Sequence, residues 1–162
     1  MDRIVKQLLP KISGYCSYQD RCRQDIIKRL EKWECPEEHW ETILEWLRDN
    51  KFWNEERFAA SFVRGKFRGN KWGKRKISMA LYQKGIDQEM GKKAMETEIP
   101  EQEYYDMALK LALKKLEQLL SKEDQKHILK GKTLQYLAGK GFEPEICYNA
   151  AEDAIYELIE KN

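Results

Sequence analysis

The sequence predicts an all-α protein made of three tandem three-helix repeats that form a curved, elongated helical array. Apolar residues recur at helical spacing in nearly every segment of the 162 residues, and no stretch alternates convincingly with period two. Four prolines and nine glycines leave room for few long loops. A helix–turn–helix outline also recurs three times along the chain, which is typical of a repeat protein.

The helices are expected, in chain order, around residues 11–18, 22–33, 40–47, 54–67, 77–81, 90–95, 101–120, 134–138 and 146–158. Residues at several ends support these positions. Pro36 precedes the third helix, and Glu37 and Glu38 lie in its first turn, where negative charge suits the helix dipole. Gly85 and Gly141 follow the fifth and eighth helices, where a left-handed glycine commonly ends a helix.

Three segments, 26–36, 77–87 and 133–143, share the repeated outline. The residues that align are Leu30, Leu81 and Leu137, followed by Cys35, Ile86 and Phe142 at the turns. Counting the helix before each segment predicts three units at 1–50, 51–97 and 98–162. A unit of about 50 residues buries too little surface to be stable alone, so neighbouring units are expected to stack. Glu34 departs from the pattern, because the other two turns carry glycine there.

Composition and cysteine usage limit the class of protein. No apolar run reaches the roughly 20 residues of a membrane helix, and residues 1–10 carry no secretory signal, so a cytoplasmic location is expected. The four cysteines are expected to be reduced and to pack as small apolar side chains. A zinc site from Cys16, Cys22, Cys35 and His39 is a weaker alternative, because structural zinc sites normally use closely paired ligands.

The sequence offers no catalytic constellation. His39 and His127 are the only histidines, and neither lies beside a candidate nucleophile in the sequence. Residues 69–75 resemble a phosphate-binding loop only in part, because Arg75 stands where a magnesium-binding Ser or Thr belongs. We therefore expect a protein that is not an enzyme and that uses no cofactor, metal or small-molecule substrate.

Charge is strongly segregated along the chain. Residues 51–97 hold twelve Lys and Arg against five acids, whereas both flanking segments carry more acids than bases. The stretch 64–76 has seven cationic residues and no acid, with Phe67 and Trp72 among them. This pattern indicates a polyanionic or acidic partner. The backbone N–H groups that follow Gly73, at the start of a helix, are expected to add positive potential for a phosphate.

Three interpretations of this basic stretch remain open. It is a solvated helix face, a surface that contacts nucleic-acid phosphates, or a surface for a protein partner that itself carries nucleic acid. The lysine-rich composition favours backbone contact over reading of base edges. Trp72 is expected to be buried against its own repeat rather than to stack on a base.

A resemblance to a known protein family rests on the segments 52–64, 71–77 and 81–86. The first contains Phe52-Trp53-Asn54-Glu55-Glu56-Arg57, and the second begins Lys71-Trp72-Gly73-Lys74. Together they resemble the central repeat of the bacterial RecX family, whose members regulate the RecA recombinase. Looser similarity around residues 15–30 and 140–142 extends the resemblance over about residues 10–160. Asn54 is a departure, since an Asp is common there in the family.

The resemblance implies a fold of three tandem three-helix repeats and a role that is not enzymatic. It implies binding to the RecA filament on single-stranded DNA, with inhibition of filament extension, ATP hydrolysis, strand exchange and SOS-type responses. The positions that match the family's cationic places, and which we expect to contact a partner or phosphate, are Arg57, Arg64, Lys71, Lys74, Arg75 and Lys76. Lys66 and Arg68 join this set by charge alone. The alternative is an independent DNA-binding helical module that uses the same central basic repeat.

Overall fold

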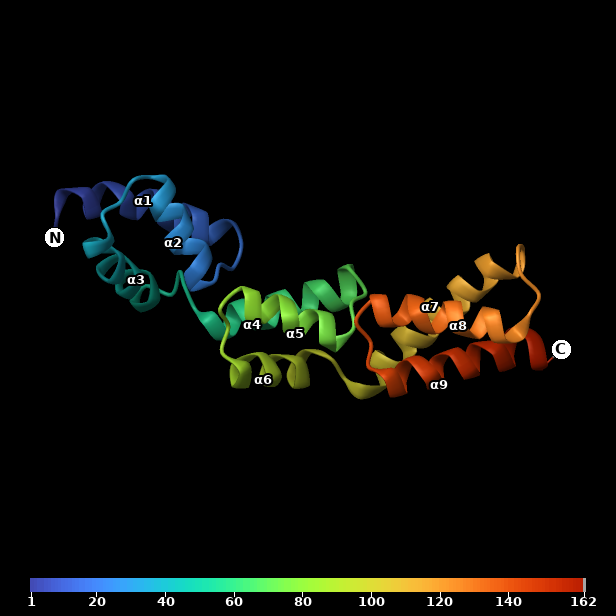
Figure 1. The fold of residues 1–162 in the computed structure, drawn as a ribbon. Coiled ribbons are helices and arrows are strands. Elements are labelled where there is room, and N and C mark those ends of the chain that lie inside the picture. Colours follow the sequence, from blue (N-terminus) through green and yellow to red (C-terminus); the bar gives the residue numbers. More distant parts are fainter. Residues whose placement is uncertain (162) are drawn as a thin grey trace. The chain divides into compact units, whose positions relative to one another are not determined.

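The computed structural model describes residues 1–161, and every regular element within them is helical (Figure 1). In chain order these are α1 (Arg3–Tyr18), α2 (Arg23–Lys32), η1 (Glu37–His39), α3 (Trp40–Asp49), α4 (Glu55–Arg64), η2 (Gly65–Gly69), α5 (Lys74–Gln83), α6 (Gln88–Glu98), α7 (Glu101–Leu120), α8 (Lys126–Gly139), α9 (Pro144–Ile155) and η3 (Tyr156–Glu160). The predicted all-α fold is confirmed, and every expected helix is present.

The described residues divide into two compact units. Unit 1 contains Met1–Phe62 and Ala80–Ala94, and unit 2 contains Val63–Met79 together with the chain from Met95 onward. The division passes through α4, α5 and α6, so the segment expected as the central repeat contributes to both units. The repeat boundaries expected after residues 50 and 97 stay a prediction.

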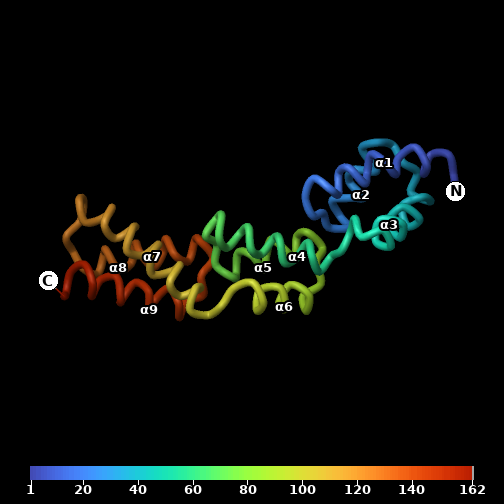
Figure 2. Tube along the Cα trace, turned by 180° about the vertical axis from the view of Figure 1, so that it is seen from behind, coloured from blue at the N-terminus to red at the C-terminus, as the bar shows by residue number. Residues whose placement is uncertain are grey.

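Unit 1 has a hydrophobic core supplied mainly by α1, α2 and α3, which lie together in both ribbon and tube views (Figures 1 and 2). The buried residues are Val5, Leu8, Leu9, Ile12, Cys16, Ile26, Leu30, Cys35, Ile43, Leu44 and Leu47. Half-buried aromatic side chains, among them Tyr15, Trp33 and Trp46, pack around this core. The helical spacing that predicted these elements is therefore the spacing of their buried faces.

Helix α1 begins earlier than the sequence indicated. Asp2 accepts a hydrogen bond from the backbone N–H of Ile4 at 2.8 Å, so the helix is capped at its first turn. Pro10 lies inside the helix on an exposed position and removes one backbone donor. Burial of Val5, Leu8 and Ile12 on one face holds the helix together on both sides of the proline.

The turns that end α2, α5 and α8 have the same geometry, in agreement with the aligned segments. The N–H groups of Cys35, Ile86 and Phe142 donate to the carbonyls of Leu30, Leu81 and Leu137 at 2.9, 3.1 and 3.2 Å. The preceding residues Glu34, Gly85 and Gly141 all have positive φ, at 58°, 76° and 99°. These are the bonds and the backbone of a left-handed helix C-terminus. Glu34 therefore adopts the turn that glycine makes elsewhere, although a side chain strains it.

Unit 2 is dominated by α7, α8 and α9, which lie side by side (Figures 1 and 2). Alanines that face the interior let α7 and α9 approach closely: Ala108, Ala112, Ala150, Ala151 and Ala154 have no exposed surface. Larger side chains, including Leu116, Leu129 and Phe142, fill the remaining core. Burying this apolar surface is the main force that stabilises the unit.

The turn after α8 packs directly on the first turn of α5, within unit 2. The N–H of Gly73 donates to the carbonyl of Lys140 at 2.8 Å, and the N–H of Arg75 donates to that of Gly141 at 3.0 Å. A Cβ atom on Gly73 would lie 2.3 Å from the carbonyl carbon of Gly141. Glycine is therefore required at position 73, because the two backbones touch.

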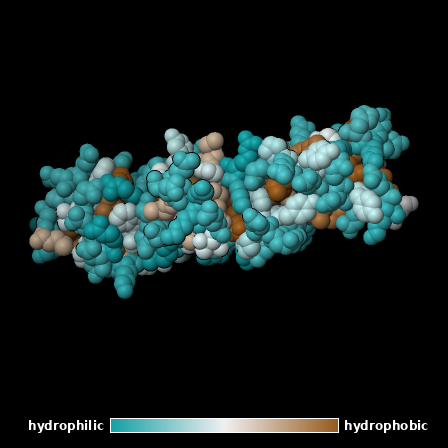
Figure 3. Space-filling model, turned by 90° about the horizontal axis from the view of Figure 1, so that it is seen from below, coloured by the Kyte–Doolittle hydropathy of each residue, from teal (hydrophilic) through white to brown (hydrophobic). Residues whose placement is uncertain are grey.

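The exposed surface is mainly polar. On the face drawn in Figure 3, hydrophilic residues dominate and hydrophobic atoms show only in small areas. Among residues 1–161, no helix is both long and apolar enough to cross a membrane.

The contact between Gly73 and Gly141 predicts opposite effects for two glycine substitutions. Gly73→Ala should lower the free energy of unfolding by about 2–3 kcal/mol, because the new methyl group overlaps backbone that cannot move aside. Gly131→Ala should raise it by about 0.5–1 kcal/mol, because Gly131 lies inside α8 with no atom within 4 Å of the added carbon. Urea unfolding followed by circular dichroism measures both, and equal stabilities for the two variants would contradict the close backbone contact.

Candidate functional site

The predicted site residues occupy four neighbouring stretches of chain. Arg57 and Arg64 lie on α4, Lys66 and Arg68 on the π-helical segment η2, Lys71 on the connection, and Lys74, Arg75 and Lys76 on the first turn of α5. Arg57 belongs to unit 1 and the others to unit 2. Their side chains have different environments, so the basic stretch is not one uniform surface.

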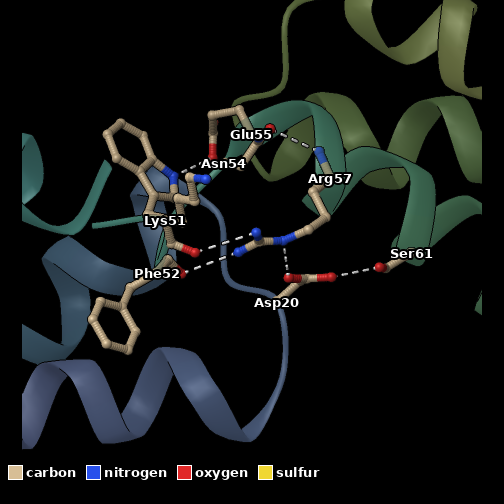
Figure 4. A network of polar contacts seen from close by, with 8 residues as sticks. Asp20, Lys51, Phe52, Asn54, Glu55, Arg57 and Ser61 are labelled. Carbon is tan, nitrogen blue, oxygen red and sulfur yellow. Dashed lines mark hydrogen bonds and ion pairs between the residues drawn. The ribbon is translucent and has the colours of Figure 1, made fainter. Parts of the chain in front are cut away.

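Arg57 is held within unit 1 by a network of polar contacts (Figure 4). Its Nε donates to Asp20 Oδ1 at 2.7 Å, and its two terminal nitrogens donate to the carbonyls of Lys51 and Phe52 at 3.3 Å. Ser61 donates to the other oxygen of Asp20 at 2.6 Å. The guanidinium therefore ties the loop after α1 to α4. Its partner contact stays a prediction, and its donors already serve the fold.

Arg64 and Arg68 have carboxylate partners supplied by later helices. Arg64 donates to both oxygens of Glu98 on α6, at 2.8 and 3.2 Å, and Arg68 pairs with Glu103 on α7 at 3.3 Å. The Arg64 hydrogen bond lowers the pKa of the Glu98 carboxyl below its usual value. The stretch 64–76 holds no acid in sequence, but folding brings acids to it and offsets part of its charge.

The amines of four lysines gather around Trp72 and the turn after α8, and we call this group the lysine cluster (Lys66, Lys71, Lys76 and Lys140). The Nζ atoms of Lys66 and Lys76 lie 4.9 and 4.7 Å from the centre of the half-buried Trp72 ring. Lys140 was not anticipated from sequence, because it lies outside the basic stretch. Its Nζ donates to the carbonyl of Asn70 at 3.0 Å.

The lysine cluster keeps a surplus of positive charge. Partial burial lowers the pKa of Lys140, and the positive charges of Lys76 and Lys71 lower it further. None of the ion pairs found among residues 1–161 involves Lys71, Lys76 or Lys140. The fold therefore holds the positive charges of Lys71, Lys76 and Lys140 near one another, and an anionic ligand would relieve their mutual repulsion.

At the start of α5, the N–H groups of Gly73, Lys74 and Arg75 are not free for a phosphate, so the expectation from the sequence is wrong for these donors. The N–H groups of Gly73 and Arg75 are bonded to the turn at 140–141, and the N–H of Lys74 donates to the hydroxyl of Tyr104 at 2.8 Å. Donors that a free helix terminus would offer are used inside the protein. Sequence could not show this, because the acceptors lie tens of residues away along the chain.

Tyr104 joins three parts of unit 2. Its hydroxyl accepts from Lys74 and donates to the carboxylate of Glu143, just before α9. Its ring packs against Phe67 and Phe142, with ring centres 6.0 and 5.2 Å apart. Burial, and then the hydrogen bond to Glu143, raise the pKa of the Tyr104 phenol above its usual range. Tyr104 is buried, and no local pattern in the sequence indicates which groups its hydroxyl contacts.

Lys74 and Arg75 differ in orientation. The Nζ of Lys74 lies 4.6 Å from the centre of the Tyr104 ring, so this side chain lies along the interior aromatic cluster. Arg75 is exposed and forms none of the ion pairs found in the described chain. Of the predicted site residues, Lys71, Lys74, Arg75 and Lys76 form none of the ion pairs found among residues 1–161, and of these Arg75 and Lys76 are exposed.

No metal site accompanies the cluster. Within residues 1–161, no three His, Cys, Asp or Glu side chains gather closely enough to hold a metal ion. Cys16, Cys22, Cys35 and Cys147 are buried and free. Burial raises the pKa of the Cys16 and Cys22 thiols to about 11, so both are protonated and weakly reactive at neutral pH.

The fold and the lysine cluster define a class, a helical-repeat protein with a concentrated cationic surface. Residues 54–95 match the family model described as RecX, second three-helix domain, and residues 101–150 match RecX, third three-helix domain. The chain belongs to the RecX family.

Individual relatives agree with this assignment. The "Regulatory protein RecX" of Oceanobacillus iheyensis is 32% identical over 129 residues, which is 80% of this chain and 46% of the relative. That of Limosilactobacillus reuteri (strain DSM 20016) is 32% identical over 149 residues, covering 92% of this chain and 52% of the relative. The chain spans about half the length of these curated relatives.

Two solved structures share the fold. A crystal structure titled as regulatory protein RecX has a TM-score of 0.78 and 29% identity, over 98% of this chain and 72% of that one. The crystal structure of RecX from Lactobacillus salivarius has a TM-score of 0.84 and 24% identity, over 96% of this chain and 97% of that one. The resemblance that the sequence indicated is confirmed.

The mutual repulsion in the lysine cluster predicts a measurable pKa change. Lys76→Gln removes a positive charge that disfavours the protonated amine of Lys140, so the pKa of Lys140 should rise toward the ordinary lysine value. NMR titration of isotopically methylated lysines reports this pKa. Lys93→Gln on the exposed surface of α6 is the control and should leave it unchanged. An unaltered Lys140 pKa in Lys76→Gln would show that the two amines are not coupled.

Proposed function

We propose that this protein is a non-enzymatic regulator that binds a RecA-type recombinase filament on single-stranded DNA. It limits filament extension, and thereby ATP hydrolysis, strand exchange and the DNA-repair responses that depend on the filament. It acts in the cytoplasm. The support is membership of the RecX family, whose relatives are named regulatory proteins, combined with the lysine cluster.

The proposed contact with DNA rests on the lysine cluster. Lys71, Lys76 and Lys140 hold positive charge that no carboxylate in the described chain neutralises. A nucleic-acid backbone supplies regularly spaced negative charge and binds such groups with release of counterions. Contact with DNA in the filament would therefore lower the repulsion among these amines. Lysines act here as point charges, which suits phosphate contact without sequence preference.

The same observation favours one second candidate, an independent DNA-binding module that uses the lysine cluster without a recombinase. The two functions differ in the stoichiometry they require. A filament regulator acts at a small number of chains per recombinase, whereas a protein that competes for bare DNA must cover the strand.

The deciding experiment titrates the protein into the single-stranded-DNA-dependent ATPase of a RecA-type recombinase. Inhibition should be complete well below one chain per recombinase monomer. Inhibition only when the DNA is saturated would support the independent module. No inhibition by the folded protein would contradict the filament regulator and favour the independent DNA-binding module.

A matched pair of variants tests whether inhibition of the recombinase ATPase depends on the lysine cluster. Lys71 and Lys51 both have left-handed backbones, with φ of 61° and 64°. Glycine adopts this backbone with less strain, so Lys71→Gly and Lys51→Gly remove the same charge without a stability cost from the turn. Lys71→Gly should raise the concentration for half inhibition about tenfold, the effect of losing one charge-assisted contact. Lys51→Gly should leave it unchanged, and equal effects would show that only total charge matters.

Charge reversal at Arg64, Lys74 and Arg75, which the sequence alone suggests, is a less selective test. Arg64→Glu would set a carboxylate against Glu98, and Lys74→Glu would disturb the packing over Tyr104. Loss of inhibition would then combine altered folding with altered contact.

A further inference from the structure

A second cationic group lies in unit 1, around the ring of Tyr15 at the C-terminal part of α1. The guanidinium carbons of Arg21 and Arg29 lie 3.8 and 4.4 Å from the centre of this ring. Arg21 also lies 5.9 Å from the Tyr18 ring, and Arg29 lies 5.8 Å from the Trp33 ring. We call Tyr15, Arg21 and Arg29, with the flanking rings Tyr18 and Trp33, the arginine–aromatic cluster.

Arg21 and Arg29 combine two features: they pack against aromatic rings, and they have no carboxylate partner in the described chain. Five other arginines do have one: Arg23 pairs with Glu41, Arg48 with Asp49, Arg57 with Asp20, Arg64 with Glu98 and Arg68 with Glu103. Neither Arg21 nor Arg29 takes part in any ion pair found among residues 1–161. Their positive charge faces aromatic rings, which hold a guanidinium in place without neutralising it.

Nearby charges do not cancel this surplus. The helix that carries Arg29 holds two acids, Asp25 and Glu31. Glu31 is exposed and forms none of the ion pairs found among residues 1–161. Both oxygens of Asp25 are occupied. Oδ1 accepts from Lys84 at 2.9 Å, and Oδ2 accepts from the N–H of Cys22 at 3.3 Å. Arg21 uses its Nε for the carbonyl of Tyr15 at 3.1 Å, which leaves its terminal nitrogens for another acceptor. The guanidinium of Arg29 makes none of the hydrogen bonds found within residues 1–161.

A guanidinium that lies against a ring presents its N–H donors at its edge, where they match two oxygens of one phosphate. The ring contacts also fix long side chains in advance, so less conformational entropy is lost when a ligand binds. Tyr18 adds an aromatic face that is 84% exposed beside Arg21. An exposed aromatic side chain next to arginines is the arrangement that single-stranded nucleic acids use, with a base on the ring and phosphates on the cations.

We propose that the arginine–aromatic cluster binds single-stranded nucleic acid directly, with phosphates on Arg21 and Arg29 and a base against Tyr18. An acidic peptide could use the two arginines, but it would leave the exposed Tyr18 ring without a partner. The site is separate from the lysine cluster, since all its residues belong to unit 1. It does not rest on the proposed filament function and is testable without a recombinase.

The test measures binding of the full chain to a fluorescent oligothymidylate by anisotropy over a series of salt concentrations. Arg29→Gln keeps most of the side-chain volume, removes the charge and breaks no hydrogen bond of the fold. It should weaken binding about tenfold and reduce the slope of log affinity against log salt by about 0.7, the value for one phosphate contact on a single strand.

Arg48→Gln is the matched control, because it removes the same charge from unit 1 at an exposed arginine already paired with Asp49. It should leave affinity and slope unchanged. Equal losses in the two variants, or no binding of the oligonucleotide by the wild-type chain, would overturn the proposal. Arg29→Lys is a control for altered folding, because it keeps the charge and loses only the forked donor of the guanidinium. It should weaken binding about threefold and leave the slope of log affinity against log salt unchanged.

Two further outcomes separate the remaining alternatives. Tyr18→Ala should weaken oligothymidylate binding and leave the weaker binding of an abasic oligonucleotide unaltered. An effect of equal size on both probes would show that Tyr18 has no contact with a base. Stronger binding of polyglutamate than of oligothymidylate, with loss in Arg29→Gln, would assign the cluster to an acidic peptide and contradict the nucleic-acid site.

Discussion

The docking of the turn at residues 140–142 onto the first turn of α5 is the constraint on which the rest of unit 2 depends. Two backbone hydrogen bonds join Gly73 to Lys140 and Arg75 to Gly141, and the Tyr104 hydroxyl takes the remaining N–H of Lys74. The contact is so close that no side chain fits at position 73. It satisfies donors at a helix start that would otherwise need water or a ligand. The contact also places Lys140 near Lys71 and Lys76, so the same packing that stabilises unit 2 forms the lysine cluster.

In the basic segment, arginines and lysines make different contacts because their side chains differ in chemistry. The forked donors of Arg57, Arg64 and Arg68 reach carboxylates and carbonyls of the chain and tie helices together. Lys71, Lys76 and Lys140 form none of the ion pairs found among residues 1–161 and keep their charge for the surface. The surplus charge on this surface is therefore smaller than the sequence count suggests, and it is concentrated at fewer positions. Arg21 and Arg29 of unit 1 depart from this pattern, because they pack on a tyrosine ring.

Most of the fold was predictable from the sequence, because it depends on local rules. Helical spacing placed the buried faces, and the alignment of Leu30, Leu81 and Leu137 anticipated three turns with the same hydrogen bond. The site was predictable only in part, because pairing partners come from distant segments. Glu98, Glu103 and Lys140 reach the basic stretch through tertiary packing, which no local pattern records. The arginine–aromatic cluster was missed for another reason, since acids elsewhere in residues 1–50 hide it in any count of charge.

The proposed contact between the lysine cluster and DNA in a recombinase filament can be measured directly. Quantitative lysine footprinting tests it on the unaltered protein, by comparing acetylation rates with and without a RecA-type filament on single-stranded DNA. The account predicts that Lys71, Lys76 and Lys140 are protected by the filament, while the exposed Lys92 and Lys93 of α6 react at unchanged rates. Protection spread evenly over all lysines, or confined to Lys92 and Lys93, would contradict the account.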